Sequence, residues 1–578
     1  MKGFFNRLLR IDLSNKDYQY DSISDSVLKT TLGGKGLGTH YLLEENPVGV
    51  DPLSPEALVI ICVGPVTGTK IWGQSRYGVY GKSPATGGFA ESYCGGTLAP
   101  KIKGCGIDAI IIKGKSDQLC YLKIDEDGVS FEDATLLKGM ETYGAGDYIA
   151  ERSAPKAGVM VIGPAGENRV RFACIKSDRW RSIGRCGFGA IFGSKNLKGI
   201  SFFGKKKAEI ADSELLSKVN KTVADKGKVS PATSLYKQMG TPMMVSTMNS
   251  NKAFPTEYWK AGHFEDFEKI NADYMLDNCE VTAHACPACF LRCTKKTRVL
   301  KGRHKDLMIE GPEYENLYAL GGLIKTNSFE EVVNLNDVCD RLGIDTMSAG
   351  NMAAFAIEAY KREKSDYKID YNQPDKVVEL FYLISHNKGF GKVLAKGIKE
   401  AAKDLDLEEI AIHVKGLEPA GYDPRALKGM ALSYATSARG ACHLRGTFYK
   451  AEISGQIPKE QIKGKAELHI DYEDRSAIFD CLILCRFFRD FDQWEELGEI
   501  IEAVTGMAMS KSELEFFANT ITQRTREYNA REGIGTEADT LPKRFFKEAT
   551  VEGETLNEED FMIMLEEYNQ IRRQRYCK

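Results

Sequence analysis

The sequence predicts a multidomain α+β protein in which one β-sheet domain precedes two mainly α-helical domains. The chain has 578 residues, which is more than one hydrophobic core usually serves. Residues 1–209 are rich in glycine and in short β-type runs, whereas apolar residues three and four apart recur from about residue 210 onward. We therefore expect a β-rich domain over 1–209 and helical domains over 210–410 and 411–578.

The individual elements follow from the residues that separate these runs. "ALVIICVG", "DAIIIKGK" and "VMVIGPAG" are apolar stretches of strand length, bounded by Gly, Pro, Asp or Ser. Further along, "FEEVVNLNDVCDRLG", "DKVVELFYLISHNKG" and "WEELGEIIEAVTGM" have helical spacing, and glycine marks where the helix stops. The first third should therefore be mostly sheet and the remainder mostly helix.

Composition excludes several classes of protein. The chain is 43% hydrophobic and 28% charged with a net charge of −3, which is too balanced for a nucleic-acid binder or a membrane-surface protein. No run approaches the roughly 18 apolar residues of a membrane span, and the N-terminus lacks the features of a signal peptide. We therefore expect a cytoplasmic protein whose 15 cysteines are reduced thiols.

Two glycine-rich stretches do not encode a classical nucleotide loop. "LGGKGLGTHYLL" at 32–43 and "GPVTGTK" at 64–70 match neither G-x-G-x-x-G after a strand nor the Walker pattern. "GQSRYGVYGKSPATGGFAESYCGG" and "RSIGRCGFGAIFGSKNLKG" instead place Arg76, Arg181 and Arg185 among glycines. Arginine beside exposed backbone N–H groups suits a phosphate-bearing ligand. Tight turns with surface arginines explain the composition equally well.

The stretch "CPACFLRC" places Cys286, Cys289 and Cys293 at C-x₂-C-x₃-C spacing. Structural zinc sites usually need a second C-x₂-C pair or two histidines, and neither follows here. Three clustered cysteines with one remote partner are typical of a [4Fe–4S] cluster. The fourth ligand should come from "FDCLILCRF", where Cys481 and Cys485 are four residues apart and would share a face of a helix.

A repeated pattern favours Cys485 as the fourth ligand. "DRLGID" runs from Asp340 to Asp345, and "DCLILC" runs from Asp480 to Cys485. Both have the form Asp-x-x-x-aliphatic-(Asp/Cys). The two stretches are therefore interpreted as related loops that hold similar ligands, one of which ends in a cluster thiolate.

With these motifs the chain resembles the tungsten-dependent aldehyde:ferredoxin oxidoreductase family over nearly its whole length. The resemblance is carried, in the same order, by "GGKGLG", "SRYGVYGKSPATGGFAESYCGGTLAPKIKGCGIDAIIIKGKS", "GRCGFGAIFGSKNLKG", "CPACFLRC", "GPEYEN", "DRLGIDT", "YATSARGACHLRG", the Asp480–Cys485 motif and "YNAREGIGTEADTLPKRF". It implies a β-sheet domain that forms a base for the cofactor, with two helical domains above it.

The resemblance also implies the cofactors and the residues that hold them. They are one tungsten (molybdenum is the alternative) bound by two pterin dithiolenes, a Mg²⁺ ion that bridges the pterin phosphates, and a [4Fe–4S] cluster. Asp340 and Asp480 would each hold one pterin ring, and Asp345 would support the first. The implied cofactor contacts are Arg76, Tyr93, Gly95, Arg181, Gly184, Arg185, Asp340, Ile344, Asp345, Asp480 and Leu484, and the implied cluster ligands are Cys286, Cys289, Cys293 and Cys485.

A glutamate and a histidine near the metal are the implied catalytic residues. "EGPEYEN" offers Glu310, Glu313 and Glu315, of which we favour Glu313 with Glu315 close behind, and "GACHLRG" offers His443. A buried carboxylate can take a proton from water or the hydrated aldehyde, and the histidine can donate a hydrogen bond to the aldehyde oxygen. A helix-capping carboxylate and a core histidine are the structural alternatives.

The implied function is oxidation of an aldehyde to the carboxylic acid, with electrons passing to ferredoxin or to a small iron–sulfur subunit. A benzoyl-CoA-type aromatic-ring reductase with the same cofactor is the alternative enzyme. An iron–sulfur electron-transfer or sensor protein without tungstopterin is the non-enzymatic one. A homodimer is left open, because the helix that carries an interfacial Glu-x-x-His metal site in the family has Asn334 here.

Overall fold

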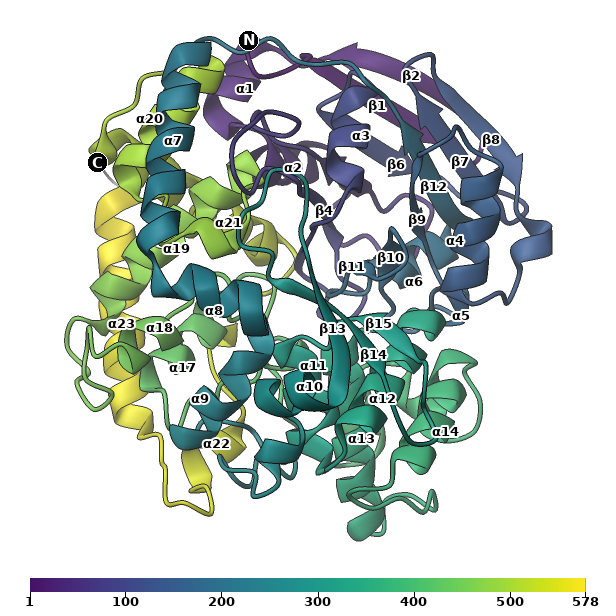
Figure 1. Ribbon diagram of the computed structural model, residues 1–578, viewed down its shortest axis with the longest axis vertical. Helices are drawn as coiled ribbons and strands as arrows, with labels where there is room; N and C mark the ends of the chain where they lie inside the picture. The colour runs from purple at the N-terminus through teal and green to yellow at the C-terminus, as the bar shows by residue number, and fades with distance from the viewer. Residues whose placement is uncertain (577–578) are drawn as a thin grey trace.

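The computed structural model describes residues 1–576, and its first third contains two six-stranded β-sheets (Figure 1). The first sheet has the strand order β2-β1-β6-β3-β4-β5 and the second β11-β10-β9-β12-β7-β8. In each sheet a single pair is parallel, β1 with β6 and β12 with β7, and the other pairs are antiparallel. The strands are β1 (Arg7–Asp12), β2 (Asp17–Ser22), β3 (Val59–Cys62), β4 (Tyr77–Lys82), β5 (Phe89–Cys94), β6 (Ala109–Lys113), β7 (Cys120–Asp125), β8 (Val129–Asp133), β9 (Gly158–Val161), β10 (Ile175–Ser177), β11 (Arg181–Ile183) and β12 (Leu197–Phe203).

Strand periodicity assigns alternate side chains to opposite faces of these sheets. Leu9 and Ile61 belong to a core shared by the two sheets, whereas their neighbours Leu8 and Ile60 pack under helices on the outer face of the first sheet. The helices of this domain are α1 (Asp25–Thr31), α2 (Gly34–Glu45), α3 (Leu98–Gly104), α4 (Thr142–Glu151), α5 (Pro164–Glu167) and α6 (Phe188–Ser194), with the 3-10 turn η1 (Thr135–Leu137).

The rest of the chain is mainly helical, which confirms the predicted fold class. A small antiparallel sheet of β13 (Cys279–His284), β14 (Thr294–Val299) and β15 (Met308–Glu310) was not expected there. The helices up to residue 404 are α7 (Ser213–Val229), α8 (Pro231–Met239), α9 (Met244–Ser250), α10 (Ala272–Asn278), α11 (Tyr314–Leu320), α12 (Phe329–Leu342), α13 (Thr346–Lys361), α14 (Pro374–Ser385), α15 (Gly391–Leu394) and α16 (Ile398–Asp404). Those after it are α17 (Lys428–Thr436), α18 (Tyr449–Ile453), α19 (Lys465–Leu482), α20 (Trp494–Thr505), α21 (Lys511–Arg531), α22 (Lys543–Lys547) and α23 (Glu558–Tyr576). The 3-10 turns are η2 (Thr241–Met243), η3 (Phe267–Lys269), η4 (Gly322–Ile324), η5 (Arg486–Phe488) and η6 (Thr536–Ala538).

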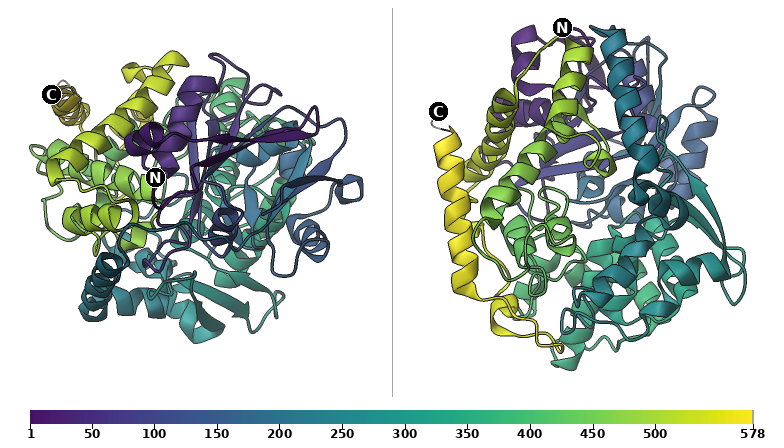
Figure 2. Two further views of the ribbon diagram at one scale, coloured as in Figure 1. Left: turned by 90° about the horizontal axis from the view of Figure 1, so that it is seen from above. Right: turned by 60° about the vertical axis from the view of Figure 1, so that its left-hand side comes forward.

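Two apolar cores hold the helical region together. The larger core takes side chains from α9 through α18, from the start of α19 and from α22 and α23, so it is continuous across residue 410. The second core contains Leu216, Val219 and Val223 of α7, packed against Ile500 and Ile501 of α20. Helix α7 lies beside α20, and α23 runs along the outer side of the region (Figures 1 and 2). The domain boundary at 410 stays a prediction.

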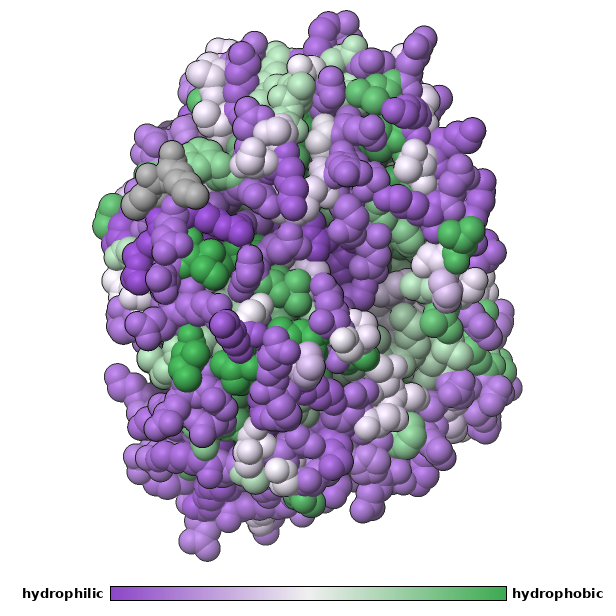
Figure 3. Space-filling model, turned by 90° about the vertical axis from the view of Figure 1, so that its left-hand side faces the viewer, coloured by the Kyte–Doolittle hydropathy of each residue, from purple (hydrophilic) through white to green (hydrophobic). Residues whose placement is uncertain are grey.

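The surface is mainly polar on the face shown in Figure 3, where apolar side chains form small separate groups. Within residues 1–576, no helix has both the length and the apolar character that a membrane crossing requires.

Helices α12 and α19, which carry the repeated pattern, end in the same way against the two sheets. Each ends at a residue in the left-handed conformation, Gly343 (φ 75°) or Ile483 (φ 59°), whose N–H donates back into the helix. Each end also abuts a Gly-Pro turn of one sheet, at Gly163 or Gly64. An added Cβ would lie 2.4 Å from the Leu342 carbonyl oxygen at Gly163 and 1.9 Å from that of Leu482 at Gly64, so only glycine fits.

Candidate cofactor and substrate site

Three half-buried thiols lie in the loop that joins β13 to β14. Cys286, Cys289 and Cys293 occupy this loop, and Ala288 and Arg292 within it adopt left-handed backbone conformations, φ 49° and 48°. These conformations turn the chain sharply at each step, so three side chains at short spacing share one small region. The loop is therefore shaped for a ligand set.

Gly73 joins this loop to the second repeated motif. Its N–H donates to the Ala288 carbonyl (2.9 Å), and its own carbonyl accepts from the Cys485 N–H (3.0 Å). An added Cβ at Gly73 would lie 3.2 Å from the Cys485 Cβ, so the approach requires glycine. The structure thus brings Cys485 to the thiol loop, as the sequence pattern predicts.

Cys481 lies elsewhere. Helix α19 ends at Leu482, so Cys481 and Cys485 do not share a helical face. The Cys481 thiol is buried beside the backbone of Gly36, and burial raises its pKa to about 12. Among the cysteines that the structure describes, only Cys485 and the three loop cysteines are not fully buried.

The spacing of the four thiols does not fit a single ion. Within residues 1–576, no three Cys, His, Asp or Glu side chains converge closely enough to bind one metal ion. The thiols are nevertheless electrostatic neighbours. Burial, followed by the charges of Glu313, Cys485, Cys289 and Cys286, raises the pKa of the Cys293 thiol. Neighbouring thiols that do not meet at one point suit the corners of an iron–sulfur cluster better than zinc.

Arg76 and Gly95 adjoin the thiols from the first sheet. Arg76 Nη1 lies 3.9 Å from Cys485 Sγ, and its Nη2 donates to the Tyr93 carbonyl (3.3 Å). A Cβ at Gly95 would lie 3.5 Å from Cys286 Sγ and 3.8 Å from Arg76 Nη1. The predicted contact residues of the first sheet therefore border the thiol group.

The arginines of the second sheet separate into two roles. Arg181 Nη2 donates to Thr294 Oγ1 (2.7 Å) and Glu310 Oε1 (3.0 Å), beside the thiol loop. Arg185, after Gly184, points toward the Asp340–Asp345 motif instead, and its Nε donates to Asp345 Oδ2 (3.0 Å). A Cβ at Gly184 would meet only the Ser182 Cβ, at 3.8 Å, so the backbone there is open to a ligand.

Asp480 lies in a buried network of charges beside Tyr93. Arg445 Nη1 donates both to Asp480 Oδ2 (2.5 Å) and to Glu91 Oε1 (2.8 Å). Arg486 Nη2 donates to the same Asp480 oxygen (2.6 Å), and the Tyr93 hydroxyl donates to Glu91 Oε2 (2.6 Å). Leu484 is buried after the helix end. Sequence reasoning missed Glu91, Arg445 and Arg486.

Asp340 and Asp345 lie in the corresponding position beside the second sheet. Lys176 Nζ donates to Asp340 Oδ1 (2.6 Å), and Ile344 forms an isolated bridge with Ala173. Asp345 accepts from the Met347 N–H and so also caps α13. Glu418 accepts a hydrogen bond from Arg185 (3.3 Å) and completes this group of buried charges. The charged partners Lys176 and Glu418 were likewise not predicted.

The residues around these two loops fit an anionic cofactor with ring donors and acceptors. Several buried guanidinium N–H groups have no hydrogen-bond partner, namely Arg439 Nε, Arg445 Nε, Arg486 Nε and Arg486 Nη1. Buried donors are normally paired, so unsatisfied guanidinium N–H groups gathered at one place indicate a bound group with acceptor atoms. The unsatisfied donors fit a cofactor rich in acceptor atoms, as a pterin is, and the cysteines fit an iron–sulfur cluster.

A largely apolar pocket of about 380 Å³ contains the predicted catalytic residues. Its lining includes Glu313, Glu315 and His443 together with Met243 and Tyr422. The His443 ring stacks on that of Tyr422 at 5.5 Å, and Tyr422 stacks on Tyr449 at 4.2 Å. A pocket of this size and polarity accommodates a small organic substrate.

The two candidate glutamates differ in how many of their carboxylate oxygens are hydrogen-bonded. Glu313 is the N-cap residue of α11, and its carboxylate accepts a hydrogen bond from the Thr241 hydroxyl. Glu315 Oε2 accepts from the Gly421 N–H (3.0 Å), but its Oε1 has no hydrogen-bond partner and lies 3.3 Å from His443 Nε2, outside hydrogen-bonding direction. Glu315 is therefore the carboxylate that has an oxygen free to take part in chemistry.

Burial sets the protonation states of this pair. It raises the pKa of Glu315 to about 8. For His443, burial and then the positive charges of Arg439, Arg185 and Arg445 lower the pKa well below its usual value. At neutral pH the pair is thus a mostly protonated carboxyl beside a neutral imidazole. A carboxyl with a pKa near the working pH is suited to proton transfer.

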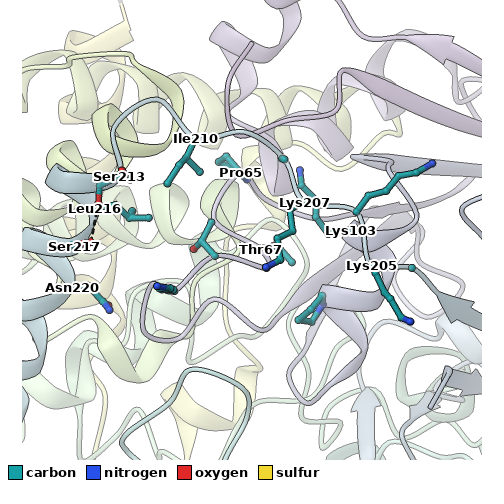
Figure 4. Close-up of a pocket in the computed structure, with 17 residues that line it drawn as sticks. Pro65, Thr67, Lys103, Lys205, Lys207, Ile210, Ser213, Leu216, Ser217 and Asn220 are labelled. Carbon is teal, nitrogen blue, oxygen red and sulfur yellow. Dashed lines mark hydrogen bonds between the residues drawn. The ribbon is translucent and has the colours of Figure 1, made fainter. Parts of the chain in front are cut away.

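A second cavity, of about 620 Å³, is lined in part by Pro65 and residues 67–70 of the β3–β4 loop, which also contains Gly73. Its lining contains Lys70, Lys103, Lys205, Lys206 and Lys207 and, among the described residues, no Asp or Glu. Figure 4 shows Lys103, Lys205 and Lys207 on one side of the cavity and Ser213, Ser217 and Asn220 of α7 on the other.

This lysine cavity is structurally continuous with the thiol loop. Asn220 of its wall accepts the Trp72 N–H through its side-chain oxygen (3.2 Å) and the Trp72 Nε1–H through its carbonyl (3.0 Å). The Trp72 ring contacts Phe290, between Cys289 and Leu291, edge-on at 5.2 Å. One aromatic contact therefore separates the cavity wall from a thiol-bearing segment.

A thiol group beside buried charges and an apolar pocket is typical of a redox enzyme, and comparisons with known proteins give the same class. The sequence model described as aldehyde ferredoxin oxidoreductase, N-terminal domain, matches residues 8–204, and that for domains 2 and 3 matches residues 217–573. The chain belongs to the aldehyde ferredoxin oxidoreductase family, which confirms the predicted resemblance, and it is an oxidoreductase of that family.

Curated relatives extend over almost the entire chain. It is 32% identical to the tungsten-containing aldehyde ferredoxin oxidoreductase of Pyrococcus furiosus and 33% identical to that of Thermococcus kodakarensis, over 96% of this chain and 93% of each relative. A WOR-like subunit of an aliphatic sulfonate oxidoreductase from P. furiosus is 28% identical over 88% of this chain and 82% of its own length.

A solved structure shows the same fold. The active site complex BamBC of benzoyl coenzyme A reductase, in complex with 1,5-dienoyl-CoA, contains a chain that superposes with a TM-score of 0.84. The two are 22% identical, and the match covers 99% of this chain and 94% of the other.

Proposed function

We propose that this protein oxidises an aldehyde to the carboxylic acid with water, using a tungstopterin, and that electrons leave through a [4Fe–4S] cluster to a ferredoxin. The observation that carries the proposal is the pairing of Glu315 with His443 in an apolar pocket. Membership of the family and the names of the tungsten-containing relatives support the cofactor.

The residues that would hold each group follow from the site. Cys286, Cys289, Cys293 and Cys485 would ligate the cluster. Asp340, Ile344 and Asp345 would hold one pterin and Asp480 and Leu484 the other, while Arg76, Tyr93, Gly95, Arg181, Gly184 and Arg185 would approach the phosphates and their Mg²⁺. The buried charges Glu91, Lys176, Glu418, Arg445 and Arg486 would orient these side chains.

The chain's own residues provide binding and proton transfer. When bound, tungstopterin would supply the two-electron acceptor that converting an aldehyde and water into an acid requires. The His443 imidazole, kept neutral, donates a hydrogen bond to the aldehyde oxygen. The Glu315 carboxylate takes a proton from the attacking water or from the hydrated aldehyde. The apolar wall limits access of bulk water to this pair.

The proposal is tested by metal analysis and a substrate panel on anaerobically purified protein. We expect tungsten or molybdenum, about four irons per chain and dye-linked turnover of acetaldehyde and benzaldehyde. Iron without tungsten or molybdenum in active protein would contradict the cofactor. Turnover of benzoyl-CoA alone would contradict the reaction and favour the ring reductase, which at present rests on similarity of fold.

The lysine cavity supports an acidic ferredoxin-type protein as the electron partner. Lys205 and Lys207 are exposed at a cavity whose wall contacts the thiol loop through Trp72 and Phe290. Positive charge at a cleft steers a negatively charged partner and acts mainly on its association rate, with strong salt dependence. The partner's electrons would then enter or leave close to the cluster.

Reversing these charges should weaken binding of the ferredoxin without lowering the rate of aldehyde oxidation. In the double variant Lys205→Glu, Lys207→Glu we expect the KM for an acidic ferredoxin to rise about tenfold at low salt, with aldehyde oxidation by a small dye unchanged. The matched control is Lys388→Glu, Lys392→Glu, two exposed lysines in the segment that follows α14. Equal effects of the two double variants, or parallel loss of ferredoxin and dye activity, would exclude this docking site.

A further inference from the structure

Arg489, at the end of η5, is a buried cation that the mechanism above does not use. The residue is 7% exposed. Nη1 donates to the Arg486 carbonyl (2.9 Å), Nη2 donates to the Tyr449 hydroxyl (3.4 Å), and Nε has no partner. The neighbouring carboxylate, Asp490, pairs with Lys450 instead. Within residues 1–576, no carboxylate lies at ion-pair distance from this guanidinium.

A buried charge that no carboxylate contacts directly is costly. Neutral carbonyl and hydroxyl acceptors offset only part of the cost of removing the guanidinium from water. Burial acts to lower the pKa of Arg489, but Tyr449 and Asp490 outweigh it and raise the pKa. The side chain therefore stays charged, and a substrate anion would supply the direct ion pair that Asp490, held by Lys450, does not make.

Arg489 lines the same apolar pocket as Glu315 and His443. A column of stacked rings connects His443 to Arg489. His443 stacks on Tyr422, Tyr422 stacks on Tyr449, and the Tyr449 hydroxyl accepts a hydrogen bond from Arg489. The guanidinium is thus two aromatic rings away from the proposed reaction centre. A substrate that reaches both must carry its negative group at a distance from the aldehyde.

We propose that Arg489 binds a carboxylate on the substrate, remote from the aldehyde carbon, so that the preferred substrates are aldehydes bearing a second, anionic end across a flat or short spacer. This inference rests on the proposed aldehyde oxidation. Arg489 would act in binding and specificity, and would take no part in proton transfer. The apolar side chains between the two polar ends suit an aromatic or short aliphatic spacer.

The test compares two aldehydes of similar shape on the intact, cofactor-loaded enzyme with a small dye as acceptor. 4-Carboxybenzaldehyde has the second carboxylate, and 4-methylbenzaldehyde is its neutral counterpart. For the unmodified protein we expect kcat/KM to be about ten- to a hundredfold higher for the carboxylated aldehyde, the range of a charge-assisted hydrogen bond. Arg489→Met should abolish this preference by lowering kcat/KM for the carboxylated aldehyde far more than for the neutral one, and Arg489→Lys should retain part of the preference.

Each outcome has a defined meaning. If the unmodified protein oxidises both aldehydes with equal kcat/KM, or if Arg489→Met lowers both equally while metal content and cluster absorption are retained, the assignment to Arg489 is wrong. If Arg489→Met does not fold, the preference of the unmodified protein and its reduction in Arg489→Lys decide. If the unmodified protein oxidises no aldehyde, the proposed function fails, and the failure is not one of Arg489.

Discussion

Replacing Cys485 with serine is expected to abolish the visible absorption and the electron paramagnetic resonance signal of the iron–sulfur cluster. Cys485 lies at the thiol loop because Gly73 hydrogen-bonds to both segments, to Ala288 at 2.9 Å and to Cys485 at 3.0 Å. A cubane cluster needs four thiolates, and the β13–β14 loop supplies three. We expect iron content to fall and ferredoxin-linked activity to drop to background.

Cys481→Ser is the matched control, since it changes the same chemical group four residues away. Its thiol is buried beside the Gly36 backbone and away from the loop. We expect this variant to keep the full cluster signal, with at most a loss of stability from placing a hydroxyl in the core. An intact cluster in Cys485→Ser, or its loss only in Cys481→Ser, would refute the assignment of the fourth ligand.

Replacing Glu315 with glutamine is expected to lower kcat by about 10²- to 10⁴-fold, the usual contribution of a general base. Glutamine keeps the shape and the hydrogen bond from the Gly421 N–H, so binding of the aldehyde should change little. The measurement is steady-state oxidation of benzaldehyde with a dye acceptor, with tungsten and iron content as the check on cofactor loading. Glu313→Gln is the counterpart, and we expect a smaller decrease, because that carboxylate accepts from Thr241 and lies at the helix N-cap. A larger decrease for Glu313→Gln would reverse the assignment.

The same pair predicts a pH dependence. Because burial raises the pKa of Glu315 to about 8, the proton-accepting form is the minority species at pH 7. The kcat should therefore rise almost tenfold per pH unit below that value and level off above it. A kcat that falls through the same range would show that the protonated form is required. In Glu315→Gln the slope should disappear.

The sequence predicts the parts of the site that are local. The three loop cysteines lie within eight residues, so their spacing alone indicates a cluster. The repeated pattern is also local, because it describes how a helix ends: α12 and α19 both finish in a left-handed residue before the aliphatic position. The order of sheet and helix likewise follows from short-range periodicity.

The charged partners of the cofactor loops could not be predicted in this way. Arg445 lies 35 residues from Asp480 and 354 from Glu91, and only the tertiary fold brings them together. Their signals were single charged residues in otherwise apolar or glycine-rich runs, as in "GFAESYCGG" and "GACHLRG". The choice between Glu313 and Glu315 depends on which side of a helix start faces His443, and residue spacing does not define that.

The paired helix ends have a consequence for where a cluster ligand can be placed. Gly64 and Gly163 contact the two helix ends in nearly the same way. The helix end at Gly64 is followed by Cys485, whereas the helix end at Gly163 is followed by Asp345. The two helix ends thus have the same backbone form, while only the one at Gly64 is followed by a thiol. If the cluster is bound as proposed, it can adjoin only one of the two helix ends, and a cluster at the other end would require new cysteines around Asp345 as well as the replacement of Asp345 itself.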